Sequence, residues 1–165
     1  MNPYIREWSS TNTGTGYYAD DLTNPDFFIE ASIATIKSEK ILTFIVRTIK
    51  PGPGGTVIRG KVKGSEFFEA MWEHFVAMGT TIDVIQGEWS DRVIFNFGKL
   101  TANLDAFNRA LLIHSTREDA ASNGTPTGRY AKKKLYTKVH FAKAEPPSQT
   151  GTGPYTDVVV QFRRP

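Results

Sequence analysis

The residues best suited to chemistry in this sequence are two side chains near its end, Lys138 and His140. They lie two positions apart in an alternating segment, so a strand would project both from the same side. An unperturbed histidine exchanges a proton near neutral pH, and a neighbouring lysine can stabilise charge on a phosphate. With Arg129 as a further cation, His140 and Lys138 are the candidate catalytic residues of a metal-independent ribonuclease. The alternative is that Lys138 and His140 belong to a solvated strand face.

A second group of polar residues suits the binding of a nucleotide or a phosphate. Asparagine amides and threonine hydroxyls can hydrogen-bond phosphate oxygens, and a tryptophan can stack on a base. The candidate substrate-binding residues are Trp89, Asn103, Asn108, Thr125 and Thr127. The structural alternative is helix capping and turn formation for the Asn and Thr residues, and a core position for the tryptophan.

The sequence gives little support to metal chemistry. It contains no cysteine, which excludes zinc sites built on Cys ligands, including those of the zinc deaminases. The local acidic groups have no diagnostic ligand spacing; they are Asp20-Asp21, Glu88 with Asp91, and Glu118-Asp119. His114 suits the end of a helix and His74 a helix surface. We therefore predict no metal site and no cofactor.

Two amphipathic helices flank a short apolar strand in the middle of the chain. Residues 65–78 and 103–111 repeat apolar side chains at helical spacing, and residues 82–89 form the strand between them. Ser65 and Asn103 are the predicted N-caps. The apolar residues of the first helix are Phe68, Met71, Trp72 and Phe75, and those of the second are Leu104, Phe107 and Leu111.

Alternating segments on either side predict hairpins. Residues 27–49 predict one, with a helix over 26–37 as the alternative. A second hairpin is predicted from residues 135–141 and 155–163. In its first strand, Leu135 is expected on the same side as Val139. Residues 93–97 predict a further strand, and 115–124 and 125–132 predict short helices, the first beginning with a Ser115–Glu118 capping box. This order favours an α+β fold with an antiparallel sheet of hairpins and two to four helices packed on one face.

Composition sets the expected domain boundaries. Residues 9–16 are a polar run of low complexity, so we predict a flexible N-terminal arm over residues 1–25 and a single domain over 26–165. Within the arm, Tyr4, Ile5 and Trp8 are expected to dock on the body. The breaker at residues 51–55 precedes a strand, which excludes a phosphate-binding loop there.

The chain is mildly basic, with a net charge of +3 and a pI near 9.1, and this favours an anionic partner. The basic excess gathers in Arg129, Lys132, Lys133, Lys134, Lys138, Lys143, Arg163 and Arg164. The alternative is that Lys132 to Lys134 form a solvated helix end, where positive charge complements the helix dipole. No apolar run approaches the ~20 residues of a membrane span. The first residues lack the apolar core of a secretory signal peptide.

Several motifs together resemble the C-terminal module of bacterial polymorphic toxins, including Rhs-type proteins. They are Ile85-Gln-Gly-Glu-Trp89, Asn103-Leu-Asp-Ala-Phe-Asn108, Glu118-Asp-Ala-Ala121, Thr125-Pro-Thr-Gly-Arg-Tyr-Ala131 and Gly153-Pro-Tyr-Thr-Asp-Val-Val-Val-Gln-Phe162. The resemblance covers about residues 55–165. It implies an effector domain that is secreted or injected into a target cell by a bacterial delivery system, and an acidic immunity protein as partner. It carries over no catalytic residue. Leu135 departs from the module, in which a glycine is expected before Tyr136.

We therefore expect an effector domain that acts on an anionic target such as RNA or a nucleotide. A non-enzymatic binding or assembly module, carried as payload or adaptor of a delivery system, is the first alternative. The second is an NAD-consuming or ADP-ribosylating toxin, which would use Arg59 and Glu88. The oligomeric state stays open at this point.

Overall fold

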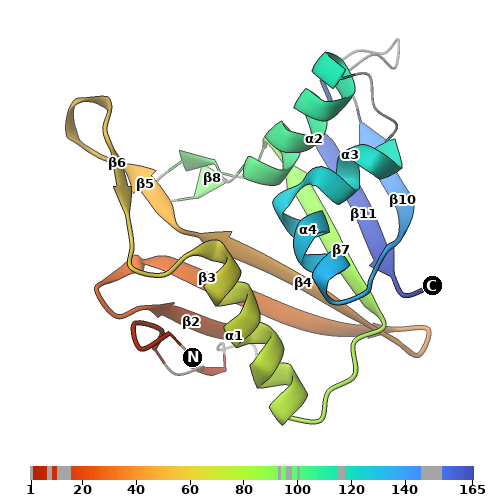
Figure 1. The fold of residues 1–165 in the computed structure, drawn as a ribbon, viewed down its shortest axis with the longest axis horizontal. Coiled ribbons are helices and arrows are strands. Elements are labelled where there is room, and N and C mark those ends of the chain that lie inside the picture. Colours follow the sequence, from red (N-terminus) through yellow and green to blue (C-terminus); the bar gives the residue numbers. More distant parts are fainter. Residues whose placement is uncertain are drawn as a thin grey trace. The chain divides into compact units, whose positions relative to one another are not determined.

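The computed structural model describes residues 2–6, 9–10, 16–92, 94–95, 98–99, 101–114, 118–145 and 154–165 (Figure 1). Its antiparallel strands and helices confirm the predicted α+β fold class. The chain divides into two compact units, Met1–Ile82 and Asp83–Pro165. The sequence predicts one domain from residue 26 onward, and this stays a prediction.

The strands of the N-terminal unit follow the order β1-β2-β3-β4, and each neighbouring pair is antiparallel. They are β1 (Ser9–Ser10), β2 (Gly16–Asp21), β3 (Asn24–Ile36) and β4 (Glu39–Arg47). The β3–β4 pair confirms the hairpin predicted over residues 27–49 and excludes the alternative helix. Alternation decides the outcome: Ile29 and Ala31 are buried, whereas Glu30 between them is exposed.

Helix α1 (Gly64–Ala77) confirms the first amphipathic helix. It packs on the sheet of its unit through aromatic pairs, with 5.6 Å between the ring centroids of Phe44 and Phe68 and 5.2 Å between those of Tyr17 and Phe75. The prediction that Ser65 is the N-cap is wrong. The helix begins at Gly64, and Lys63 is the N-cap. Gly79 follows the helix with a φ of +68°, which glycine adopts without a steric cost.

A second hairpin of the N-terminal unit joins β5 (Ile49–Pro51) to β6 (Val57–Arg59). A short 3₁₀ turn, Pro53–Gly55, lies at its tip. Gly54 and Gly55 have φ values of +62° and +75°, so the Pro-Gly breaker serves this turn. In Figure 1 the hairpin extends beyond β2, β3 and α1 of the same unit.

The predicted flexible arm over residues 1–25 does not hold for its second half, where residues 16–21 form β2 and β3 begins at Asn24. Ile5 forms a bridge with Asp21, which confirms that it docks on the body, whereas Tyr4 is 44% exposed and its docking is not borne out. Burial explains why β2 is ordered, since three consecutive residues of β2, from Ala19 to Asp21, are buried. Trp8 lies outside the described residues.

The strands of the C-terminal unit follow the order β7-β11-β10, and both neighbouring pairs are antiparallel. They are β7 (Val84–Ser90), β10 (Lys138–Glu145) and β11 (Asp157–Arg163). Burial alternates strictly along the central strand β11, where Val158, Val160 and Phe162 are buried. A small hairpin joins β8 (Ile94–Phe95) to β9 (Gly98–Lys99); the rest of the strand predicted over 93–97 lies outside the described residues.

Helices α2 (Ala102–His114), α3 (Glu118–Gly124) and α4 (Pro126–Lys133) contact one another and cover one face of this sheet (Figure 1). The ring centroids of Trp89 and Phe107 are 6.0 Å apart, so β7 packs on α2 through this pair. Asn103 is not the N-cap of α2, because the helix begins one residue earlier, at Ala102. The predicted cap Ser115 lies outside the described residues.

The turn after α4 is the tight turn for which the resembling module would use glycine. Leu135 has a φ of +68°, and the N–H of Tyr136 donates to the carbonyl of Ala131. The prediction that Leu135 lies in a strand on the same side as Val139 is wrong, because a left-handed residue cannot continue a strand. Its side chain is 70% exposed, and Tyr136 is buried instead.

Candidate functional site

The sheet of the C-terminal unit carries polar side chains on the face turned away from its helices, and we call this the polar sheet face. In the strand register, Lys138 lies opposite Arg163, and His140 lies opposite Gln161. Gln161 in turn lies opposite Gln86 of β7. Residues directly opposite each other in an antiparallel pair share a face. The members of the polar sheet face are Gln86, Glu88, Lys138, His140, Gln161 and Arg163.

Hydrogen bonds link four of these side chains across two strands. Arg163 donates from Nη2 to Oε1 of Gln161 over 2.9 Å, and Gln161 donates from Nε2 to Oε1 of Gln86, also over 2.9 Å. Gln86 completes the chain by donating from Nε2 to Oε1 of Glu88 over 2.6 Å. This row of hydrogen bonds therefore runs from the guanidinium of Arg163 to the carboxylate of Glu88, and the amides of Gln161 and Gln86 each have a fixed orientation.

His140 and Lys138 both lie exposed beside Arg163, at the basic end of this row of hydrogen bonds. Their Cα atoms are about 7 Å apart, as for any alternate residues of a strand. A phosphodiester that reaches the imidazole would have two cations, Lys138 and Arg163, on the same side of the sheet. The arrangement has the parts for proton transfer beside a stabilised anion.

The structure does not bring Arg129 to this pair. Arg129 lies on α4, in the helical layer that covers the opposite face of the sheet. Its Nη1 donates to the carbonyl oxygen of Gly124 over 2.9 Å, at the end of α3. The three predicted catalytic residues are therefore divided between two faces of the sheet. The arginine that lies on the same face as His140 and Lys138 is Arg163 and not Arg129.

Three of the predicted substrate-binding residues have hydrogen bonds that join helices. Thr125 is the N-cap of α4: its hydroxyl accepts from the N–H of Gly128 at 3.0 Å and donates to the carbonyl of Ser122 at 2.7 Å. Asn103 accepts the N–H of Thr127 at 2.8 Å, which ties α2 to α4. Thr125 and Thr127 are both buried. These contacts are those of the structural alternative, capping and turn formation.

The other two, Asn108 and Trp89, also have structural contacts. The amide of Asn108 pairs with the main chain of Tyr155, donating to its carbonyl at 2.9 Å and accepting its N–H at 2.8 Å. Trp89 is 7% exposed, and its indole lies over Gly87, where an added Cβ would come within 2.7 Å of it. Gly87 therefore leaves the space in which Trp89 packs.

Sequence reasoning missed Gln161 and Arg163 as members of the site. The signal was present, because Val158, Val160 and Phe162 point into the core, so Gln161 and Arg163 must point away from it. The strand pairing was the missing information. Only the register places Arg163 opposite Lys138 and away from Arg129.

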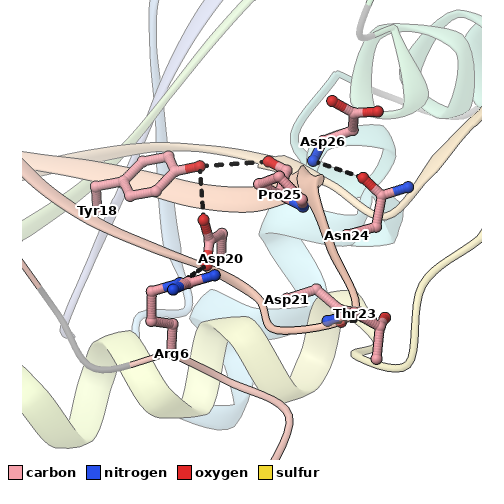
Figure 2. A network of polar contacts seen from close by, with 8 residues as sticks. All are labelled: Arg6, Tyr18, Asp20, Asp21, Thr23, Asn24, Pro25 and Asp26. Atoms are coloured by element: carbon pink, nitrogen blue, oxygen red, sulfur yellow. Dashed lines mark hydrogen bonds and ion pairs between the residues drawn. The ribbon is translucent and has the colours of Figure 1, made fainter.

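The N-terminal unit contains a second polar cluster, drawn in Figure 2. Arg6 donates from Nε to Oδ1 of Asp20 over 2.7 Å, and the hydroxyl of Tyr18 lies 3.4 Å from Oδ2 of the same carboxylate. Burial, and then the charge and hydrogen bond of Asp20, raise the pKa of Tyr18 to about 12. Asn24 accepts the N–H of Asp26 at 3.0 Å, and Lys50 forms an ion pair with Asp26. This cluster joins the segment 2–6 to β2 through Arg6 and Asp20, and β2 to the start of β3, where the hydroxyl of Tyr18 donates to the carbonyl of Pro25.

The carboxylate of Asp21 lies beside this cluster and is fully buried. Oδ1 accepts the N–H and the hydroxyl of Thr23, at 2.8 Å and 2.5 Å, and Oδ2 accepts the N–H groups of Lys61 and Val62, at 2.6 Å and 3.1 Å. Burial alone would raise the pKa of Asp21, but these hydrogen bonds outweigh it and the net shift is downward. A Cβ on Gly60 would lie 2.5 Å from Oδ2, so a glycine is needed where the loop passes the carboxylate.

The remaining candidates for metal or proton chemistry are histidines and acidic pairs. Among the residues that the structure describes, no cluster of three or more His, Asp or Glu side chains could hold a metal ion. His74 packs edge-on against Tyr17, with 5.3 Å between ring centroids, and burial lowers its pKa. The side chain of His114 is outside the described set. Arg59 belongs to the N-terminal unit and Glu88 to the C-terminal unit.

None of the helices in the described part of the chain combines the length and the apolarity needed to cross a bilayer. Comparisons of the whole chain with protein-family models, with curated proteins and with solved structures give no match.

Proposed function

We propose that this chain is a bacterial effector domain that binds a single-stranded polynucleotide along the polar sheet face, with RNA as the target. The single observation that carries the proposal is the β10–β11 register, which places two cations, Lys138 and Arg163, on the same exposed face as His140. The resemblance to polymorphic toxins supports the effector class. The mild basic charge of the chain supports an anionic target.

In this proposal, RNA is cleaved without a metal. His140 accepts the proton of a 2′-hydroxyl as that oxygen attacks the adjacent phosphorus, and the bond to the 5′-oxygen breaks. Lys138 and Arg163 stabilise the negative charge that develops on the phosphoryl oxygens. Solvent, to which this face is open, supplies the proton for the leaving 5′-oxygen. Gln161 keeps the guanidinium of Arg163 in place through their hydrogen bond.

The test is induction of the chain in a bacterial host, followed by incubation of the purified protein with RNA in the presence of a chelator. His140→Gln should lower the cleavage rate by about 10²- to 10⁴-fold, the usual contribution of an acid–base group. Lys138→Gln should lower cleavage and binding, whereas the charge-matched control Lys133→Gln on α4 should not. If purified His140→Gln cleaves RNA as fast as the wild type, the catalytic role is wrong.

Salt dependence of RNA binding separates catalysis from binding. If Lys138 and Arg163 each contact a phosphate, neutralising either one should reduce the slope of log affinity against log salt by about 0.7 for a single strand. Binding that shows this change without any cleavage would favour the non-enzymatic binding module. An unchanged slope in both variants would refute the proposed interface.

An acidic immunity protein is the second partner that we propose. Arg129, Lys132 and Lys133 lie exposed on α4, two of them in its last turn. A basic surface of this kind attracts an acidic protein and accelerates its association. Replacing Lys132 and Lys133 with Gln should slow association with such a partner at low salt; an association rate that neither salt nor these changes affect would exclude the charged contact.

A further inference from the structure

The β5–β6 hairpin of the N-terminal unit, residues Ile49–Arg59, which we call the hairpin arm, has an unusual distribution of charge. From residue 48 to residue 65 the sequence contains no acidic residue and four basic ones. Lys50 is ion-paired with Asp26, and the other three are the exposed side chains of Arg59, Lys61 and Lys63. The eight residues of the tip, 51–58, carry no charge. Positive charge is therefore confined to the base of the arm and to residues 60–63, which follow it.

One face of the hairpin arm exposes aliphatic side chains, Val57 in the tip and Ile49 at the base. Ile49 lies opposite Arg59, and Pro51 lies opposite Val57, so these four share one side of the hairpin. Ile49 is 43% exposed and Val57 is 53% exposed. On the other side, Ile58 lies against Gly52, where an added Cβ would meet Cγ1 of Ile58 at 3.0 Å.

The polar backbone groups of the tip are already partly satisfied. The N–H of Gly52 donates to the carbonyl of Thr56 at 2.8 Å, and the N–H and hydroxyl of Thr56 both donate to the carbonyl of Pro53, at 3.2 Å and 2.6 Å. Pro51 and Pro53 have no N–H at all. Transfer of this turn out of water therefore costs less than transfer of an ordinary loop, whose N–H groups would lose their hydrogen bonds.

These three features fit the surface of an anionic bilayer. Peripheral elements bury apolar side chains about 5–10 Å into the boundary between headgroups and acyl chains, while basic residues stay at the phosphates. Val57 lies two residues beyond Arg59, which is about 7 Å along a strand. A nucleic acid would use the basic residues but would gain nothing from an exposed aliphatic tip.

We propose that the hairpin arm docks the protein on an anionic lipid surface, with Val57 inserted at the headgroup boundary, Ile49 beside Arg59 at the edge of that boundary, and Arg59, Lys61 and Lys63 at the lipid phosphates. This docking is independent of the RNA chemistry proposed for the C-terminal unit. Its basis is the charge and packing of the arm alone.

The test uses vesicles made of equal parts phosphatidylglycerol and phosphatidylcholine, with pure phosphatidylcholine vesicles as reference. The full chain should float with the anionic vesicles at low salt and remain free with the neutral ones. Replacing Arg59, Lys61 and Lys63 with Gln should weaken the apparent affinity by about 100-fold, since each basic residue near an anionic surface contributes about fivefold. Replacing Ile49 and Val57 with Thr, which keeps the β-branched shape, should weaken it by about tenfold.

Matched controls separate docking from general charge and hydrophobicity. Neutralising Lys132, Lys133 and Lys134 removes the same charge from the C-terminal unit and should leave most of the binding. Val76→Thr removes an aliphatic side chain on α1 that is 61% exposed and should have no effect. If the control variants lose as much affinity for anionic vesicles as the arm variants do, the proposal is overturned.

The absence of cysteine allows a direct measurement of insertion. A polarity-sensitive fluorophore attached to Val57→Cys should shift to the blue on anionic vesicles, whereas one attached to Val76→Cys should not. An unshifted label at position 57, or arm variants that lose affinity for RNA or for an acidic protein but keep their affinity for vesicles, would overturn the assignment to lipid.

Discussion

Asp21→Asn tests the energetic role of the most deeply buried carboxylate that the structure describes. Wild-type Asp21 accepts hydrogen bonds from Thr23, Lys61 and Val62 on both of its oxygens. An asparagine retains one acceptor oxygen and turns an NH₂ group toward two donors. The substitution therefore removes two charge-assisted hydrogen bonds, each worth about 1.5–3 kcal/mol, and the free energy of unfolding should fall by about 3–6 kcal/mol.

Urea denaturation followed by circular dichroism measures this change, with Glu73→Gln on the exposed side of α1 as the charge-matched control. Folding lowers the pKa of Asp21, so the unfolded chain binds its proton more readily than the folded chain. The contribution of Asp21 is therefore complete above the unfolded pKa of about 3.9 and is lost as the pH falls through the lower folded pKa. The difference between wild type and Asp21→Asn should shrink over that acidic range. A difference of under 1 kcal/mol at pH 7, or one that does not change on acidification, would refute the role of these hydrogen bonds.

Three further substitutions test contacts in the C-terminal unit by urea denaturation. Leu135→Gly should raise the free energy of unfolding by about 0.5–1 kcal/mol, because glycine avoids the left-handed strain and the exposed leucine gains little from packing; a loss of stability would show that its side chain is needed. Gly128→Ala should lower it by about 2–3 kcal/mol, since the new Cβ would lie 2.0 Å from the carbonyl oxygen of Ser122, and a neutral result would mean that α3 and α4 separate freely. Asn108→Ala should cost about 1–3 kcal/mol through its two lost bonds to the main chain of Tyr155, and wild-type stability would mean that water replaces them fully.

Hydrophobic periodicity predicted much of the fold because burial alternates wherever a strand has one covered face. Ile29 and Leu42 in one hairpin, and Val158 to Phe162 in another strand, are examples. The same rule failed at Leu135, where the conformation of one residue after a helix reverses which side chains are buried. Local sequence gives no direct measure of that conformation, because leucine rarely adopts it.

The site was predicted only as far as neighbours within one strand allow. Lys138 and His140 share a face because they are two residues apart, and the structure keeps them together. Arg163 joins them through strand pairing, which short-range patterns do not contain. Asn108 illustrates the opposite case, because its partner Tyr155 is 47 residues away. A side chain that is suited to ligand binding therefore hydrogen-bonds the main chain of a distant segment instead.

The contact between Asp21 and Lys61 spans 40 residues of chain, and this separation has a consequence for folding kinetics. Closing so long a loop costs entropy before any hydrogen bond forms, whereas the β3–β4 hairpin closes across a turn of two residues. We therefore expect the hairpin to be formed in the folding transition state and the contacts of Asp21 with Lys61 and Val62 to form after it. Substitutions at Asp21 should then give low φ-values, mainly accelerating unfolding and changing the refolding rate little.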